Sequence, residues 1–286
     1  MTTIEWARNA DGSRGRSWNP ATGCSPISKG CQHCYAQRMA RRLAGRVGYP
    51  EYPDHFQVTL HPERLDEPLR WRKPQRVFVC SMGDLFHPDI DIEPEFVSDV
   101  LSICTKAHWH TFILLTKRPD RMLVALKEFY SEVRYLNSLK ADWVAPNIWS
   151  GVTVESQLTA DVRIPILLQI PAAVRWVSYE PALESVDFTT IRDTAWRDNQ
   201  EWQPGQPMGT MNALNSLDWI IAGGETGPGA RPADVSWFRD VRDQCQEAGV
   251  PFFYKGAGTA TVHKKHFTYR LIGGQKYEQW PEVRNG

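Results

Sequence analysis

Three cysteines stand close together near the N-terminus, where Cys24, Cys31 and Cys34 form a C-x6-C-x2-C pattern within Gly23–Tyr35. The chain has no apolar run of the roughly 20 residues that span a bilayer. Its first residues also lack the apolar core of a signal peptide, so we expect a cytoplasmic protein with no membrane partner. In that reducing compartment, clustered cysteines favour metal or redox chemistry over a disulfide.

The spacing of the three cysteines restricts the kind of metal. We expect Cys31 and Cys34 on one face of the first turn of a helix, with Cys24 approaching from the preceding loop. Structural zinc takes four protein ligands, and His33, which lies between Cys31 and Cys34, would point elsewhere if both cysteines bound one ion. An iron–sulfur cluster fits better, because three thiolates on a four-iron cluster leave one iron open. S-adenosylmethionine (SAM), which supports radical chemistry, is the ligand we favour for that iron.

The composition is that of an ordinary globular protein. With 286 residues, of which 42% are hydrophobic and 23% charged, the chain is able to form a sizeable core. We expect one domain over residues 1–286, with excursions at 47–73 and 193–217. The remaining cysteines stand in apolar or helical settings and are expected to be buried: Cys80, Cys104 and Cys245.

Short apolar runs alternate with amphipathic stretches along the chain. Strands are predicted at Arg76–Cys80, Thr111–Thr116, Asn147–Val152, Val174–Tyr179, Asp218–Gly223 and Pro251–Tyr254. Helices are predicted at Cys31–Gly45, Glu93–Ala107, Pro119–Tyr130, Ser156–Gln169 and Ala233–Ala248. This alternation predicts an α/β fold with a mostly parallel sheet, either a barrel or an open doubly wound sheet.

Ionisable side chains follow every one of these predicted strands. Both fold classes place their chemistry at the carboxyl ends of the strands. One or two such groups would be expected as helix caps, whereas a full set favours an active site. The groups are Asp84, Lys117, Glu155, Glu180, Glu225 and Lys255.

The net charge of zero hides an asymmetry along the chain. Residues 1–46 carry eight Lys or Arg against two Asp or Glu, and residues 254–286 carry six against two. The two ends are therefore basic, and in a closing barrel they would form a surface that attracts phosphates. The alternative is that these cations only solvate helix faces.

Six segments carry a resemblance to a known family. They are Ser17–Leu43, Ser81–Ile90, Thr111–Met122, Trp149–Glu155, Arg175–Pro181 and Ile220–Pro232. Together they resemble a three-cysteine-motif family that is frequent in bacteriophages and prophages and similar to radical-SAM enzymes. The resemblance implies a partial (β/α) TIM-type barrel of the radical-SAM kind and a [4Fe–4S] cluster bound by Cys24, Cys31 and Cys34. Two features depart from the pattern: the longer first gap between cysteines, and the sequence YKGAGT at Tyr254–Thr259.

The resemblance also implies roles for further residues. His33 would pack on the adenine of SAM, and Asp84, with Ser81 and Gly83, would receive the methionine amino group. Thr153 and Glu155 would hold the ribose or the methionyl carboxylate. The candidates for catalysis or substrate binding are Lys117, Glu180, Glu225, Arg231 and Lys255.

The activity that follows from the resemblance is hydrogen abstraction by a 5′-deoxyadenosyl radical, with an electron donor as partner. We expect the substrate to be a modified base in phage DNA, or a nucleotide, that undergoes isomerisation or rearrangement. One alternative is a radical lyase that repairs damaged pyrimidines, for which Cys80 is the candidate hydrogen donor. Another is a non-enzymatic nucleic-acid-binding module that carries zinc or a cluster.

Overall fold

We describe the protein from a computed structural model, in which residues 4–93, 95–192, 209–262, 265–267 and 270–282 are described. The chain divides into two compact units, each of which is treated by itself below. The first comprises Met1–Gly151, Ile170–Ala173 and Val283–Gly286, and the second comprises Val152–Gln169 and Val174–Glu282. The single domain expected over 1–286 stays a prediction.

The fold is mixed α/β and contains a seven-stranded sheet, hydrogen-bonded in the order β1-β4-β5-β6-β7-β10-β11. Four neighbouring pairs of strands, β1 with β4, β4 with β5, β7 with β10 and β10 with β11, run parallel. The strands are β1 (Arg16–Trp18), β4 (Arg76–Val79), β5 (Thr111–Thr116), β6 (Ile148–Val154), β7 (Val174–Tyr179), β10 (Trp219–Gly223) and β11 (Phe252–Gly256). The boundary between the two units falls within β6.

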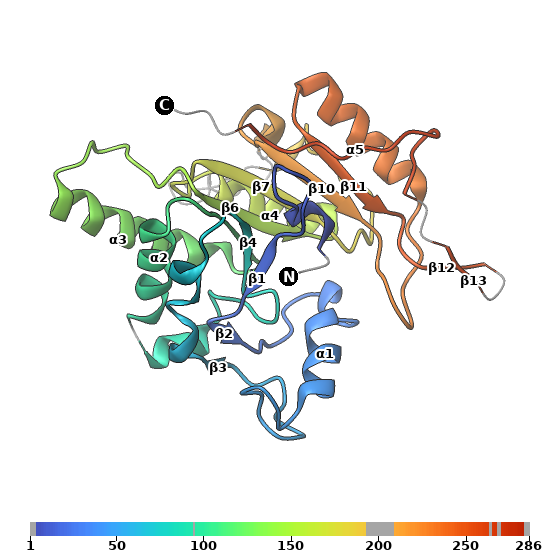
Figure 1. The fold of residues 1–286 in the computed structure, drawn as a ribbon. Helices are drawn as coiled ribbons and strands as arrows, with labels where there is room; N and C mark the ends of the chain where they lie inside the picture. The colour runs from blue at the N-terminus through green and yellow to red at the C-terminus, as the bar shows by residue number, and fades with distance from the viewer. Residues whose placement is uncertain (1–3, 94, 193–208, 263–264, 268–269, 283–286) are drawn as a thin grey trace, which may run out of the picture. The chain divides into compact units, whose positions relative to one another are not determined.

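The first unit contains β1, β4 and β5 with three helices. These are α1 (Tyr35–Leu43), α2 (Phe96–Lys106) and α3 (Pro119–Asn137), and α2 and α3 pack side by side (Figure 1). Strand β5 buries Phe112, Ile113 and Leu114 in succession, as expected for a parallel strand covered on both faces. A short antiparallel pair joins β2 (Ala21–Thr22), just before the cysteine loop, to β3 (Thr59–Leu60), which follows α1 in the chain.

The second unit contains β7, β10 and β11 with two helices, α4 (Gln157–Leu167) and α5 (Val235–Ala248). Gly249, at φ 71°, ends α5 in the left-handed conformation that glycine adopts readily. Two short antiparallel pairs join β8 (Ile191–Arg192) to β9 (Thr210–Met211) and β12 (Ala260–Val262) to β13 (Lys265–Phe267). In neither unit does a helix of the described ranges combine the length and apolar composition needed to cross a membrane.

The expected alternation of strands and helices is confirmed, and all six predicted strands form within two residues of their predicted ends. The helix predicted over Cys31–Gly45 is wrong in its first part. A 3₁₀-helix ends at Cys31, and α1 begins only at Tyr35, because Cys34 has a ψ of 125°, outside the helical range. Cys31 and Cys34 therefore do not share the first turn of a helix. Of the excursion at 193–217, residues 193–208 lie outside the described residues.

Candidate functional site

The predicted site residues fall into two groups, one in each unit. The first unit holds the group around the cysteines: Cys24, Cys31, His33, Cys34, Ser81, Gly83, Asp84 and Lys117. The second unit holds the other group: Thr153, Glu155, Glu180, Glu225, Arg231 and Lys255. We describe the cysteine group first.

The cysteine loop is placed by backbone contacts at its first residues. Gly23 forms an isolated parallel bridge with Gly83, and the Cys24 N–H donates to the Phe56 carbonyl oxygen at 3.1 Å. Gly23 has a φ of 87°, and a Cβ there would lie 2.2 Å from the Gln57 carbonyl oxygen. A Cβ on Gly83 would lie 2.8 Å from the Gly23 carbonyl oxygen. Both glycines are therefore needed for the loop to pass so close to its neighbours.

Two cations that directly follow β5 point at two of the thiols. Arg118 Nη1 lies 3.4 Å from Cys24 Sγ, and Lys117 Nζ lies 3.5 Å from Cys31 Sγ. All three cysteines of the loop are free thiols of intermediate burial. Charge-assisted donors of this kind favour the thiolate, which is the form that binds metal.

Cys34 has different surroundings from the other two cysteines. It is the N-cap residue of α1, and its N–H donates to the Cys31 carbonyl oxygen at 3.2 Å. The residue packs against a small buried cluster of Ala36, Ala40, Tyr49 and Met82. The predicted adenine-packing residue, His33, is half-buried in the turn just before it.

The surroundings shift the pKa values of Cys24 and Cys31 in opposite directions. Burial raises the pKa of Cys24 to about 11, and the negative charge of Asp84 adds to this effect against the influence of Arg118. Burial also opposes ionisation of Cys31, but the positive charge of Lys117 and hydrogen bonds from the loop backbone hold its pKa below the ordinary value of 9.0. Cys31 is therefore the readier of the two to form a thiolate.

Asp84 is buried and its carboxylate accepts several hydrogen bonds from the protein. Thr116 Oγ1 lies 2.8 and 2.9 Å from its two oxygens, the Phe86 N–H donates to Oδ1 at 3.0 Å, and Arg118 Nη1 donates to Oδ2 at 3.0 Å. Asp84 thus fixes the arginine that contacts Cys24. The predicted contact of Asp84 with the methionine amino group would have to share a carboxylate that already has these donors.

Arg118 also forms hydrogen bonds with Ser25, the residue after Cys24. Its Nη2 donates to the Ser25 carbonyl oxygen at 3.0 Å and to Ser25 Oγ at 3.2 Å. Ser25 Oγ lies 2.6 Å from Nε2 of the buried His87, whose Nδ1 accepts from the Asp89 N–H at 3.1 Å. The Ser25 N–H also donates to His87 Nε2 at 3.2 Å, so backbone N–H groups point at both nitrogens of this ring.

Sequence reasoning did not single out Arg118, Thr116, Ser25 or His87. The signal for Arg118 was its position beside Lys117 at a predicted strand end. Ser81, which was predicted, donates through Oγ to Asn19 Oδ1 at 3.2 Å, so Asn19 also belongs to this group.

The donor set suits an iron–sulfur cluster. One short loop brings three free thiols, and two neighbouring cations offset the negative charge that thiolate ligands would carry. Within the described ranges, no three or more His, Cys, Asp or Glu side chains gather closely enough to hold a single metal ion. A four-iron cluster is larger than one ion, so its thiolates need not converge on one point.

The second unit presents three carboxylate–cation pairs at or just beyond its strand ends. Arg163 Nη1 donates to Glu155 Oε2 at 3.1 Å and to the Thr153 carbonyl oxygen at 2.6 Å, and all three residues are buried. Ser156 caps α4, so Glu155 is not the capping residue. Removing Arg163 would leave a buried carboxylate without this partner, a change that typically costs about 3–5 kcal/mol.

Glu225 and Arg231 form a bidentate pair. Arg231 donates from Nη2 to Oε1 at 2.6 Å, from Nε to Oε2 at 2.9 Å and from its backbone N–H to Oε2 at 2.8 Å. The turn that carries Glu225 packs tightly, because a Cβ on Gly224 would lie 2.0 Å from the Ala257 carbonyl oxygen. Hydrogen bonding to Glu225 raises the pKa of Arg231, and burial only partly opposes this effect. Arg231, a predicted candidate for substrate binding, thus has its guanidinium paired with Glu225.

Lys255 and Glu180 form the most accessible of the three pairs. Lys255 Nζ lies 2.6 Å from each carboxylate oxygen of Glu180, and the two side chains are 28% and 22% exposed. Lys255 is the extra residue of a β-bulge, because Ala222 pairs with Tyr254 while Gly223 pairs with Gly256. Bulges commonly re-aim a side chain beside a functional site.

Gly223 on the strand between them makes room for this pair. A Cβ at Gly223 would lie 3.2 Å from Lys255 Cβ and 3.4 Å from the Glu180 carboxyl carbon. The Lys255 side chain therefore passes over β10 at Gly223, which has no side chain to obstruct it. In this way it reaches Glu180, the residue that follows β7. The bulge thus directs the Lys255 side chain towards Glu180, and Gly223 leaves space for it.

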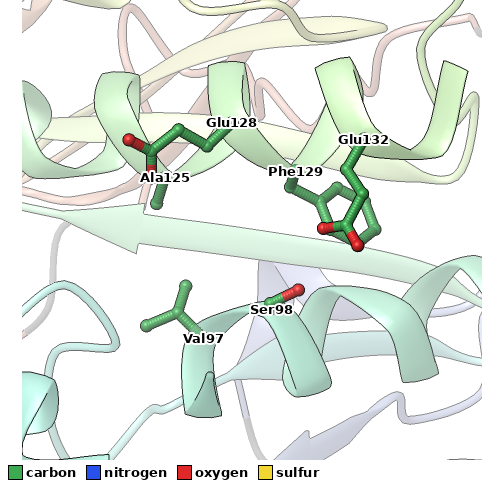
Figure 2. A pocket seen from close by; sticks show the side chains of 6 residues that line it. All are labelled: Val97, Ser98, Ala125, Glu128, Phe129 and Glu132. Atoms are coloured by element: carbon green, nitrogen blue, oxygen red, sulfur yellow. The ribbon is translucent and has the colours of Figure 1, made fainter. Parts of the chain in front are cut away.

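A hollow between α2 and α3 lies apart from the predicted site residues. Figure 2 shows Val97 and Ser98 on α2 facing side chains of α3. Its lining consists of Val97, Ser98, Ala125, Glu128, Phe129 and Glu132. None of the predicted site residues lines it.

The remaining cysteines are buried, as expected. Burial raises the pKa of Cys80 and of Cys245 to about 12, and it raises that of Cys104 as well. Cys80, at the end of β4, therefore lacks the accessibility that a hydrogen donor to a substrate would need. The repair-lyase alternative gains no support from it.

Comparison with known proteins places the chain in a family. Neither the curated proteins nor the solved structures gave a match. A family model described as a protein of unknown function (DUF5131) matches residues 1–281. Because that match covers nearly the whole sequence, the chain belongs to the DUF5131 family.

Proposed function

We propose that the protein is a radical-SAM enzyme that holds a [4Fe–4S] cluster on Cys24, Cys31 and Cys34. The observation that carries the proposal is the pair of cations, Lys117 and Arg118, aimed at two free thiols of the same loop. Such donors lower the cost of assembling several thiolates in one half-buried place. The parallel strands also support the partial barrel of the radical-SAM kind that the resemblance implies.

Each residue of the first unit has a definable task in this proposal. Cys24, Cys31 and Cys34 would bind iron, and SAM and the cluster together supply one-electron chemistry that yields a radical able to take hydrogen from carbon. Lys117 offsets the charge of Cys31, while Arg118 holds Cys24 and the Ser25 carbonyl in place. Asp84 keeps Arg118 oriented.

The second unit supplies groups for binding a substrate or moving a proton. Lys255 and Glu180 are the best candidates, because both are partly exposed and each holds the other in a fixed position. Glu225 with Arg231, and Glu155 with Arg163, are more deeply paired and suit the positioning of neighbouring backbone. The substrate we propose is a modified base in phage DNA, or a nucleotide, that undergoes isomerisation or rearrangement. An electron donor would be a further partner.

Anaerobic reconstitution with iron and sulfide tests this function. We expect about four iron and four sulfide per chain, and 5′-deoxyadenosine on reduction in the presence of SAM. Cys24→Ala, Cys31→Ala and Cys34→Ala should each lower the iron content sharply. Cys245→Ala, which alters a buried cysteine of the other unit, is the matched control and should retain the iron.

One zinc per chain with no cleavage of SAM would refute the enzyme and favour the non-enzymatic module. Iron loading without any 5′-deoxyadenosine would retain the cluster but refute the use of SAM. Both outcomes are read on the full chain, by metal analysis and by chromatography of the nucleoside product.

A further inference from the structure

The exposed face of α1 and the loop after it carry an unusual combination of side chains. Helix α1 buries Ala36 and Ala40 against the first unit, and its opposite face is open. We call this set the arginine–tyrosine surface and define it by the exposed Tyr35, Arg41, Arg42, Arg46 and Tyr52 and the half-buried His55. It begins one residue after Cys34, so it adjoins the cysteine loop in sequence.

The arginines of this surface are available to an anionic partner. Arg41, Arg42 and Arg46 are exposed, and within the described part of the chain no carboxylate forms an ion pair with any of them. Residues 35–57 contain four arginines against two acids, Glu51 and Asp54, so the segment has a net positive charge. Such a cluster of exposed cations on a helix and the loop after it is the electrostatic footprint expected for phosphates.

Two large aromatic side chains are exposed among these cations. Tyr35 is 60% and Tyr52 67% exposed. The Tyr52 ring stacks on His55 with 5.5 Å between ring centres and 10° between planes, and the Arg41 guanidinium lies 5.8 Å from the Tyr52 ring centre. Tyr52 is thus held by contacts with Arg41 and His55, while most of its surface stays open to solvent. Exposed rings held flat in this way are platforms on which unpaired bases stack.

We propose that the arginine–tyrosine surface binds single-stranded DNA, with phosphates on Arg41, Arg42 and Arg46 and a base stacked on Tyr52. The combination favours a nucleic acid over an anionic lipid or an acidic protein, because those partners would use the arginines without needing flat aromatic rings. Unpaired bases are required, since a duplex hides the base faces. The choice of DNA over RNA rests on the proposed function, whereas the surface itself stands on the contacts described above.

The test is fluorescence anisotropy with the cluster-free full chain and a labelled oligothymidylate of about 15 nucleotides. Tyr52→Ala should weaken binding about tenfold, and Tyr52→Trp should restore it, because a ring again offers a stacking face. The triple variant Arg41→Gln/Arg42→Gln/Arg46→Gln should reduce the slope of log affinity against log salt by about 2, at roughly 0.7 per lost phosphate contact.

Matched controls come from the same unit. Tyr135 is 85% exposed on α3, so Tyr135→Ala removes an equally accessible ring elsewhere. Arg72→Gln/Lys73→Gln/Lys127→Gln removes the same charge from other exposed positions. Both controls should bind the oligonucleotide like the parent protein. Thermal unfolding of every variant shows whether a loss of binding reflects a loss of fold.

Several outcomes would overturn the inference. They are equal affinity of parent and Tyr52→Ala, equal effects of the two triple variants, or arginine-dependent binding to phosphatidylserine vesicles that matches binding to the oligonucleotide. Binding is measured without cluster or SAM, so a failure to assemble iron would count against the enzyme while leaving this surface in place. Preference for an oligouridylate would move the assignment from DNA to RNA and would contradict the proposal as stated.

Discussion

Lys117 and Arg118 show how two neighbouring residues are assigned to different partners. Their side chains leave the end of β5 in different directions, one to Cys31 and the other to Cys24. Arg118 is also tied to Asp84, so it serves two acidic groups in a buried place, where a charge-assisted bond is strongest. Lys117 is less buried and is the more replaceable of the two.

The thiols of the cluster-free protein should differ in reactivity. At pH 7.5, iodoacetamide should modify Cys31 faster than Cys24, because the thiolate reacts and the pKa of Cys31 is lowered whereas that of Cys24 is raised. Lys117→Met should slow the modification of Cys31 several-fold and leave that of Cys24 nearly unchanged. Peptide mass spectrometry of a time course measures both rates.

Raising the pH provides the control for this prediction. Cys24 should become reactive only as the pH approaches its pKa of about 11, well above the range in which Cys31 ionises. Equal rates for the two thiols at pH 7.5 would contradict the assignment of Lys117 to Cys31.

At the scale of elements, apolar runs were a reliable guide to the sheet. Thr111–Thr116 and Val174–Tyr179 form strands with the predicted bounds, because their consecutive apolar residues suit a strand buried on both faces. The strand Arg16–Trp18 was not predicted, since three residues with an arginine and a serine give no period to read. The start of α1 was misplaced because spacing alone does not reveal the extended ψ at Cys34.

The partners of the predicted site residues were harder to foresee than the residues themselves. Asp84 and Arg118 are 34 residues apart, and Thr116 joins them through a hydroxyl group. Such contacts depend on which strand ends meet in space, and no local pattern encodes this. Strand ends could be identified from the sequence, whereas the pairing of their charges required the fold.

The backbone of the cysteine loop passes so close to its neighbours at Gly23 that one added methyl group should disturb it. Gly23→Ala places a Cβ 2.2 Å from a backbone oxygen at a φ of 87°, so the loop must shift. We expect a loss of about 2 kcal/mol in stability and a further loss of iron loading, since Cys24 follows directly. Gly12→Ala, at a φ of 79° with nothing within 4 Å, is the matched control for the backbone penalty alone.

Urea unfolding and iron analysis of the two variants distinguish the backbone strain of an alanine at positive φ from a displacement of Cys24. If Gly12→Ala and Gly23→Ala lose the same stability and load the same iron, the close approach is not what places Cys24.

For the whole molecule, three buried histidines of the first unit should make the folded state less stable at low pH. Burial lowers the pKa of His61, His87 and His110 below the ordinary 6.5, and nearby arginines act in the same direction. The unfolded chain therefore binds more protons than the folded one below pH 6.5. The contribution of these histidines to stability should be constant above that value and should fall as the pH drops through it, by up to about 1.4 kcal/mol per pH unit for each histidine.

His110 offers the sharpest check of this effect. Its Nδ1 accepts from the Gln75 N–H at 3.1 Å and its Nε2 lies 3.0 Å from the Pro68 carbonyl oxygen, so His110→Gln can retain an acceptor and a donor. The variant should show a shallower loss of stability between pH 7 and 5 in urea titrations. His108→Gln, which changes an exposed histidine two residues away, is the matched control. Identical slopes for His110→Gln and the parent would remove His110 from this account.

The bulge in β11 has a consequence for how this chain tolerates deletion. Lys255 has no partner in the pairing of β11 with β10, because Tyr254 before it pairs with Ala222 and Gly256 after it pairs with Gly223, the next residue of β10. Deletion of Lys255 should therefore give regular pairing between β10 and β11 without a change of register. It would remove only the ammonium group that lies over Gly223. The ladder therefore does not require Lys255, whereas the carboxylate of Glu180 would lose its ammonium partner together with that residue.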